Sequence, residues 1–119
     1  MKNIDSYTHT RGESIYLDDI PLIRGTLFAA CFDSPIAHGK LLSIDTSEAE
    51  TSEGVVKVLT HKDITGANQI GGIIPDEPLL ADHQVHFCGM PIVLVLADTD
   101  EAARKAVKKI KVQIDPLPV

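Results

Sequence analysis

Residues 90–115 read MPIVLVLADTDEAARKAVKKIKVQID and predict three consecutive elements. The apolar run 90–97 is too short to span a membrane and is typical of a strand buried on both faces. Apolar residues then recur at helical spacing from Ala102 to Ile110, which predicts one main helix over about 99–110. A second strand follows at 111–115. Because strand, helix and strand follow within so short a span, we expect a right-handed βαβ crossover with parallel strands.

The ends of this helix carry capping and charged residues. Either Asp98 or Thr99 can accept a bond from a backbone N–H of the first turn. Asp100 and Glu101 lie where the helix dipole favours negative charge, and two lysines lie at the opposite end, where it favours positive charge.

The charge balance argues against nucleic acid as the main partner, since 17 acidic residues outnumber 11 basic ones. Five of the basic residues nevertheless fall within eight positions. A phosphate-binding patch and a solvated helix face are both possible uses of this cluster, and the apolar stripe of the helix favours the solvated face. The five residues are Arg104, Lys105, Lys108, Lys109 and Lys111.

Length and composition indicate one soluble globular domain. The chain has 119 residues, 44% of them hydrophobic and 24% charged, so wholesale disorder is excluded. No stretch reaches the length of a membrane helix, and residues 1–10 lack the apolar segment of a signal peptide. We therefore expect a cytoplasmic protein without membrane contact, with a flexible arm at 1–10 and a single domain at 11–119.

The rest of the chain supplies further strands for the sheet. Strands are predicted at 27–32, 39–45 and 55–59, with a short helix after Asp45 and one helical turn at 60–64. Residues 64–78 form a long loop rich in glycine and proline, and such loops are usually functional or mobile. Short β pieces are predicted at 79–81 and 85–87. These elements indicate an α+β fold with a mixed sheet.

The chemistry-bearing residues do not assemble into a catalytic site. His83, His86 and Cys88 offer three metal ligands, but on a strand His83 points away from the other two. Cys31 and Cys88 are expected to be two buried thiols. The glycines fit no nucleotide-binding pattern, and there is no serine-hydrolase elbow. We assign no catalytic, cofactor-binding or metal-binding residue.

Several stretches, taken in order, carry a resemblance to one family. They are GESIYLDDIP (12–21), SPIAHGK (34–40), SIDTSEA (43–49), GVVKVLT (54–60), DEPLLAD (76–82) and VLADT (95–99). This ordered set resembles the molybdenum-containing hydroxylases, xanthine dehydrogenase and aldehyde oxidase, whose large subunit begins with an α/β hammerhead domain.

The resemblance implies a domain of a larger oxidoreductase that hydroxylates purines, related heterocycles or aldehydes. The parent would use molybdenum–molybdopterin, iron–sulfur clusters and FAD, none of them held by this chain. Its partners would be the remaining domains of the molybdenum subunit and the iron–sulfur and FAD domains or subunits. The isolated chain would not be an enzyme, and an apolar patch left uncovered would allow it to self-associate.

The resemblance also gives the long loop a role. In relatives, the residues just before the Asp-Glu pair line the funnel that leads substrate to molybdenum, and here these are Ile73 and Ile74. The alternative is that both fold back onto the domain core. Met90 departs from the family pattern, because relatives often carry a polar residue after the glycine. The competing functional hypothesis is a free-standing, non-catalytic binding or scaffold module with the same fold.

Overall fold

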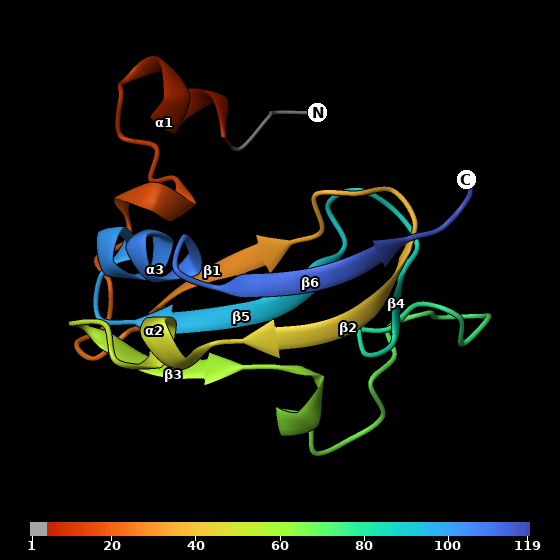
Figure 1. Ribbon diagram of the computed structural model, residues 1–119. Coiled ribbons are helices and arrows are strands. Elements are labelled where there is room, and N and C mark those ends of the chain that lie inside the picture. Colours follow the sequence, from red (N-terminus) through yellow and green to blue (C-terminus); the bar gives the residue numbers. More distant parts are fainter. Residues whose placement is uncertain (1–4) are drawn as a thin grey trace.

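The computed structural model describes residues 5–119 and contains two three-stranded sheets with three short helices (Figure 1). The strands are β1 (Phe28–Asp33), β2 (Gly39–Asp45), β3 (Val55–Leu59), β4 (Gln84–Val85), β5 (Pro91–Ala97) and β6 (Lys111–Pro116). The helices are α1 (Ser6–Thr10), α2 (Ser47–Glu50) and α3 (Asp100–Val107), and single 3-10 turns occur at η1 (Leu17–Asp19) and η2 (His61–Asp63).

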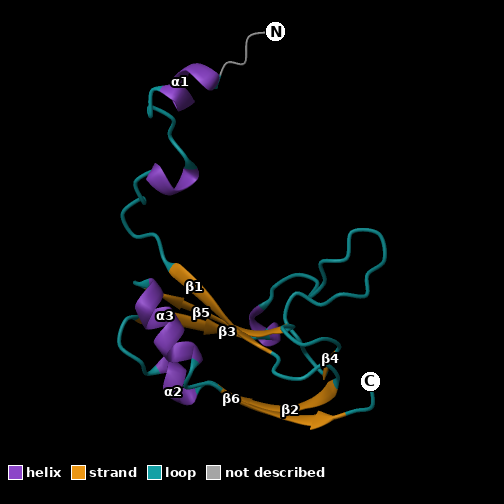
Figure 2. Cartoon of the chain, turned by 90° about the horizontal axis from the view of Figure 1, so that it is seen from above, coloured by secondary structure: helices purple, strands orange, loops and turns teal. Residues whose placement is uncertain are grey.

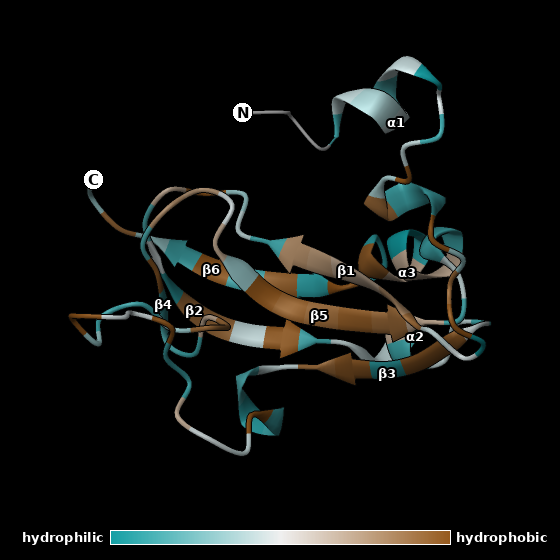
Figure 3. Ribbon diagram, turned by 180° about the vertical axis from the view of Figure 1, so that it is seen from behind, coloured by the Kyte–Doolittle hydropathy of each residue, from teal (hydrophilic) through white to brown (hydrophobic). Residues whose placement is uncertain are grey.

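The first sheet is organised around β5, as its apolar run predicts. β5 lies between β1 and β3 and pairs antiparallel with both, so that Val95 faces Ala30 on one side and Val58 on the other. Four of its seven residues are fully buried, among them Ile92 and Val95, and the strand is hydrophobic over most of its length (Figure 3). The predicted strand is therefore present and buried on the face of Val93, Val95 and Ala97, whereas Leu94 and Leu96 on the other face are only half-buried.

The second sheet has the order β4-β2-β6, again with antiparallel neighbours. Gly39 of β2 approaches β6 so closely that an added Cβ would lie 2.6 Å from the Ile114 side chain and 2.9 Å from the Asp115 carbonyl oxygen. β2 therefore requires glycine at this position.

The α+β fold is confirmed, but the expected mixed sheet with a parallel βαβ unit is wrong. Both edges of β5 are occupied by β1 and β3, and α3 instead carries the chain to the second sheet, where β6 pairs with β2. Along β6 exposed residues alternate with half-buried Val112 and Ile114. A strand with one solvated face suits an antiparallel sheet, because parallel sheets are covered on both faces.

Helix α3 packs on the first sheet through small residues. Ala103 and Ala106 are fully buried, and the Thr99 hydroxyl caps the helix by accepting the backbone N–H of Ala102 at 3.1 Å. The Asp98 backbone N–H instead donates to the Gly54 carbonyl. Thr99 is therefore the residue that caps the predicted helix.

The five clustered basic residues are all exposed, as the solvated-face interpretation predicts. Arg104 pairs with Asp100 at 2.8 Å and Lys105 with Glu101 at 2.7 Å, each one turn apart on α3. Such exposed pairs contribute little to the stability of the helix, because water screens them.

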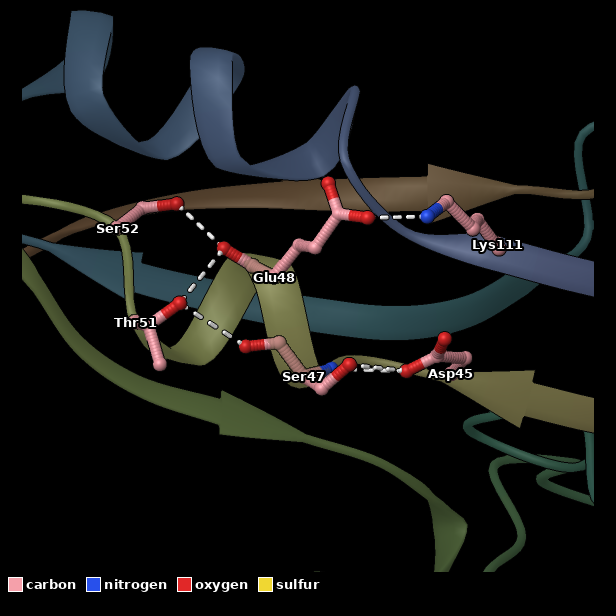
Figure 4. Close-up of polar contacts among 6 residues, drawn as sticks. All are labelled: Asp45, Ser47, Glu48, Thr51, Ser52 and Lys111. Atoms are coloured by element: carbon pink, nitrogen blue, oxygen red, sulfur yellow. Dashed lines mark hydrogen bonds and ion pairs between the residues drawn. The ribbon is translucent and has the colours of Figure 1, made fainter.

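Side-chain contacts join helix α2 to β2 and β6 of the second sheet (Figure 4). The Asp45 carboxylate accepts the Ser47 hydroxyl at 2.6 Å and the Ser47 backbone N–H at 3.1 Å, and these two bonds lower the pKa of Asp45. Glu48 pairs with Lys111 of β6, and this contact raises the pKa of Lys111. The short helix expected after Asp45 is present, with Thr46 as its N-cap residue and without a side-chain cap hydrogen bond.

The remaining differences concern the N-terminus and the stretch before β4. Residues 1–4 of the expected flexible arm lie outside the described residues, and residues 6–10 form α1. Residues 79–81 are not a strand, although Ala81 is fully buried. Met90 is also buried, and its sulfur accepts the backbone N–H of His86 at 3.4 Å. In this chain Met90 is a core residue.

Candidate functional site

The loop of residues 64–78 projects away from both sheets between η2 and β4 (Figure 2). It begins at a capped turn. The Asp63 carboxylate accepts the backbone N–H of Thr60 at 2.8 Å, and the Thr60 hydroxyl accepts the N–H of Lys62 at 3.3 Å. These bonds fix the direction in which the chain leaves β3.

The capped turn has a defined pH dependence. The backbone N–H of Thr60 is the main cause that lowers the pKa of Asp63. Because the folded-state pKa is depressed, the stabilisation is present above the unfolded-state pKa and is lost as pH falls through the folded-state value. A carboxyl-carbon NMR titration should therefore place the Asp63 midpoint below that of the unfolded chain. Equal midpoints would contradict the capping bond.

The stem of the loop is closed by Asn68. Its amide group donates to the Leu80 carbonyl at 2.7 Å, and its amide oxygen accepts the Leu80 backbone N–H at 3.0 Å. Two residues further in, the backbone N–H of Ile70 donates to the Glu77 carbonyl at 2.8 Å. Since Leu80 is 6% exposed, Asn68 ties the loop to the domain core.

The tip of the loop holds both predicted funnel residues in solvent. Ile73 is 98% exposed and Ile74 is 64% exposed. The tip is tight, because a Cβ at Gly71 would lie 2.0 Å from the Ile74 carbonyl oxygen. The alternative that both isoleucines fold onto this domain's core is therefore wrong. The two β-branched side chains are instead exposed at a loop tip whose stem is held by hydrogen bonds and whose turn requires glycine at position 71.

An apolar hollow of about 230 Å³ lies beside the stem of the loop. Ile64, Leu79 and Leu80 contribute one wall from the two ends of the loop, and Leu59 and Leu94 contribute the other from the first sheet. The loop tip and most of this hollow present apolar surface, and Cys31, Thr60 and Asp63 border the hollow. Such a surface can hold or guide an apolar molecule.

Comparison with known proteins identifies the family. Residues 11–118 match the family described as aldehyde oxidase and xanthine dehydrogenase, a/b hammerhead domain. The chain belongs to this family.

The similarity to members of the family is close in sequence and in structure. The chain is 45% identical over 107 residues to xanthine dehydrogenase 1 of Arabidopsis thaliana, a match covering 90% of this chain and 8% of that protein. An aldehyde oxidoreductase structure from Desulfovibrio gigas superposes with a TM-score of 0.85 and 37% identity, covering 97% of this chain and 14% of the other. A Cu,Mo-CO dehydrogenase superposes with a TM-score of 0.88 and 33% identity, covering 100% of this chain and 15% of the other.

The hammerhead chain spans between 8% and 14% of the length of the relatives it matches in sequence. Within residues 5–119, no helix has the length and hydropathy needed to cross a membrane.

The histidines of the hammerhead domain form two separate pairs. The His83 ring lies 6.4 Å from that of His61, whereas His86 lies 6.2 Å from His38. His83 and His86 therefore do not converge, as strand alternation predicts. Among residues 5–119, no group of three or more His, Cys, Asp or Glu side chains is arranged to hold a metal ion. The Nδ1 atom of His61 is buried without a hydrogen-bond partner in the same described range.

Both cysteines of the hammerhead domain are free and exposed, so the prediction of two buried thiols is wrong. Cys31 faces Leu94 across the first sheet and borders the apolar hollow. Partial burial there, and then the negative charge of Asp33, raise the pKa of the Cys31 thiol. The apolar run around Cys31 belongs to a sheet face that is open at this point, and this is why sequence composition misplaced the residue.

Sequence reasoning missed the two hydrogen bonds between Asn68 and the backbone of Leu80, which we call the clamp. A polar residue in a glycine-rich loop carries no signal for a partner twelve positions away. The available signal was indirect: an asparagine can satisfy a backbone N–H and a carbonyl at once, as a buried chain segment requires.

Proposed function

We propose that this chain is the amino-terminal hammerhead domain of the molybdenum-binding subunit of a xanthine dehydrogenase-like oxidoreductase. The parent would hydroxylate purines, related heterocycles or aldehydes in the cytoplasm. Within it, residues 11–119 would form a single domain after a flexible arm at 1–10, and that domain would support the structure and one wall of the substrate funnel. The similarity to dehydrogenases and oxidoreductases favours this function over a free-standing binding module.

The cofactors of the parent would be held outside this domain. Iron–sulfur clusters are held by four cysteine thiolates, and this chain has only two cysteines. The lining of the apolar hollow and the loop of residues 64–78 include no lysine or arginine that could hold a pterin or flavin phosphate. Molybdenum, bound elsewhere in the parent, would supply the carbon hydroxylation, and electrons would leave through the iron–sulfur and FAD domains or subunits.

The observation that carries the funnel role is the exposure of Ile73 and Ile74 on a tip that is anchored at its stem. Such a wall favours binding of a planar, largely apolar substrate, because the contact removes apolar surface of both the substrate and the wall from water. The tip contributes no proton or electron transfer. It would therefore act on binding and entry, and leave the chemical step to the remainder of the parent.

Replacing both isoleucines by serine tests this role. In the molybdenum-containing parent, Ile73→Ser with Ile74→Ser should raise KM about tenfold, equivalent to about 1.4 kcal/mol, and leave kcat and molybdenum content unchanged. The matched control is Ile70→Ser, since Ile70 is 53% exposed but lies at the stem of the same loop. Unchanged KM for purine, heterocycle and aldehyde substrates alike would contradict the proposal.

The mass and metal content of the native protein test the wider proposal. A polypeptide or complex several-fold heavier than 12.9 kDa that carries molybdenum is the expected result. A native 12.9 kDa protein that purifies alone and without molybdenum would contradict it.

A further inference from the structure

Residues 13–27, which we call the strap, run away from the two sheets between α1 and β1 (Figures 1 and 2). The extension is large on the scale of the molecule. The radius of gyration is 19.0 Å, whereas a compact chain of this length has a value of about 14 Å. Residues 15–27 are all exposed, so the strap is not packed as the rest of the chain is.

Local hydrogen bonds give the strap a defined shape. The Asp19 carboxylate accepts the backbone N–H of Tyr16 at 2.9 Å and closes the turn at η1. The backbone N–H of Thr26 donates to the Ile23 carbonyl at 3.0 Å, across a turn that places Gly25 at a φ of +88°. A positive φ at the third position of such a turn is natural for glycine. The strap is thus shaped by its own turns and not by the sheets.

The side chains of the strap are strongly apolar and uncovered. Leu17 is 82% exposed, Leu22 is 68% exposed and Ile23 is 83% exposed. Together with Ile20 they surround a shallow hollow on the strap itself. A soluble protein rarely leaves such a contiguous apolar patch in water unless the patch is an interaction site.

The solved relatives are much longer than this chain. In the Cu,Mo-CO dehydrogenase, which superposes with a TM-score of 0.88, the part that matches this chain makes up only 15% of that relative's chain. The rest of such a chain provides surface on which a segment outside the two sheets can pack. This favours an occupant from the remainder of the parent polypeptide.

We propose that the strap docks onto the molybdenum-binding remainder of the parent polypeptide. The partner surface is apolar: it presents a side chain or helix face that enters the hollow and covers Leu17, Leu22 and Ile23. The inference rests on the proposed function, because it requires that this remainder exists. It adds to that function a specific attachment segment, distinct from the loop tip at Ile73 and Ile74.

Cleavage by trypsin after Arg24, an exposed residue within the strap, reports whether the strap is covered. The substrate is the native molybdenum-containing polypeptide, and a synthetic peptide of residues 13–27 sets the uncovered rate. We expect cleavage in the native polypeptide to be at least roughly tenfold slower than in the peptide. Cleavage at the peptide rate in an intact, molybdenum-loaded polypeptide would overturn the proposal.

A pair of matched variants then tests the apolar contact itself. Leu22→Glu with Ile23→Glu should restore fast cleavage after Arg24, whereas Leu22→Ile with Ile23→Leu should keep it slow. Should the glutamate variant fail to fold, amide exchange of residues 20–26 in the wild-type polypeptide provides the same readout. Fast exchange there would overturn the proposal, and slow exchange would support it.

Mass and molybdenum content, measured before protease is added, distinguish a failure of the strap proposal from a failure of the proposed function. If the polypeptide carries molybdenum but is cleaved after Arg24 at the rate of the peptide, the proposal that the strap docks is wrong and the proposed function stands. A 12.9 kDa protein without molybdenum overturns both. Protection of Arg24 that rises with protein concentration identifies a second copy as the occupant and overturns the assignment to the remainder of the parent.

Discussion

Replacing Ile92 by alanine should destabilise the domain by about 2–5 kcal/mol. Ile92 is 0% exposed in β5, the strand that pairs with both neighbours in the first sheet, and it belongs to the main hydrophobic cluster. Truncation removes its apolar contacts and leaves a cavity that a strand bonded on both edges cannot close. Urea unfolding monitored by circular dichroism would measure the loss.

Val56→Ala in β3 is the matched control for this prediction. Val56 is 54% exposed at a bulge in the pairing with β5, so its loss should change stability by about 0.5 kcal/mol or less. Similar losses at Ile92 and Val56 would mean that β5 is not the centre of the core.

Replacing Asn68 by alanine should cost about 1–3 kcal/mol and release the loop of residues 64–78. The substitution leaves the Leu80 backbone N–H and carbonyl without the partners that they have now, at a residue that is 6% exposed. Hydrogen exchange across residues 66–80 should accelerate well beyond the change in global stability. The result would show that the clamp, and not the tip, sets the position of the loop.

Two neighbouring variants separate the contributions to the clamp. Asn68→Asp keeps an acceptor for the Leu80 N–H but loses the donor to its carbonyl, so an intermediate effect is expected. Gln69→Ala removes a single bond to the Gly71 carbonyl and should leave exchange at Leu80 unchanged. Equal exchange in all three variants would contradict the clamp.

The sequence predicts most of the elements but not their partners, and it misses α1 and wrongly predicts a strand at 79–81. The apolar run of β5 and the alanine stripe of α3 are local features that local spacing predicts, whereas the spacing narrows the cap of α3 only to Asp98 or Thr99. Which strand lies beside β5 depends on residues that are distant in the chain, such as Ala30 and Val58. Helix spacing between two strands suggested a parallel crossover, whereas the half-solvated pattern of β6 belonged to an antiparallel sheet.

The candidate site was predictable to a different degree in each part. The long loop and its two isoleucines were identified because glycine and proline mark a loop, and the family resemblance assigned it a role. The clamp at Asn68 and the exposure of Cys31 could not be predicted from the sequence, because both depend on which residues the folded chain places next to them. Spacing reports which face a residue occupies and does not report whether that face is covered.

The pairing of β2 with β6 sets the order in which this domain can form during synthesis. Ser43 of β2 and Gln113 of β6 are 70 positions apart, and they lie in the same sheet. The first sheet, by contrast, is complete once β5 has been made. A nascent chain can therefore assemble one sheet on the ribosome while β2 waits with an unpaired edge for the last strand. An unpaired strand edge can pair with other chains, so we expect the risk of aggregation to be highest in the interval before β6 emerges.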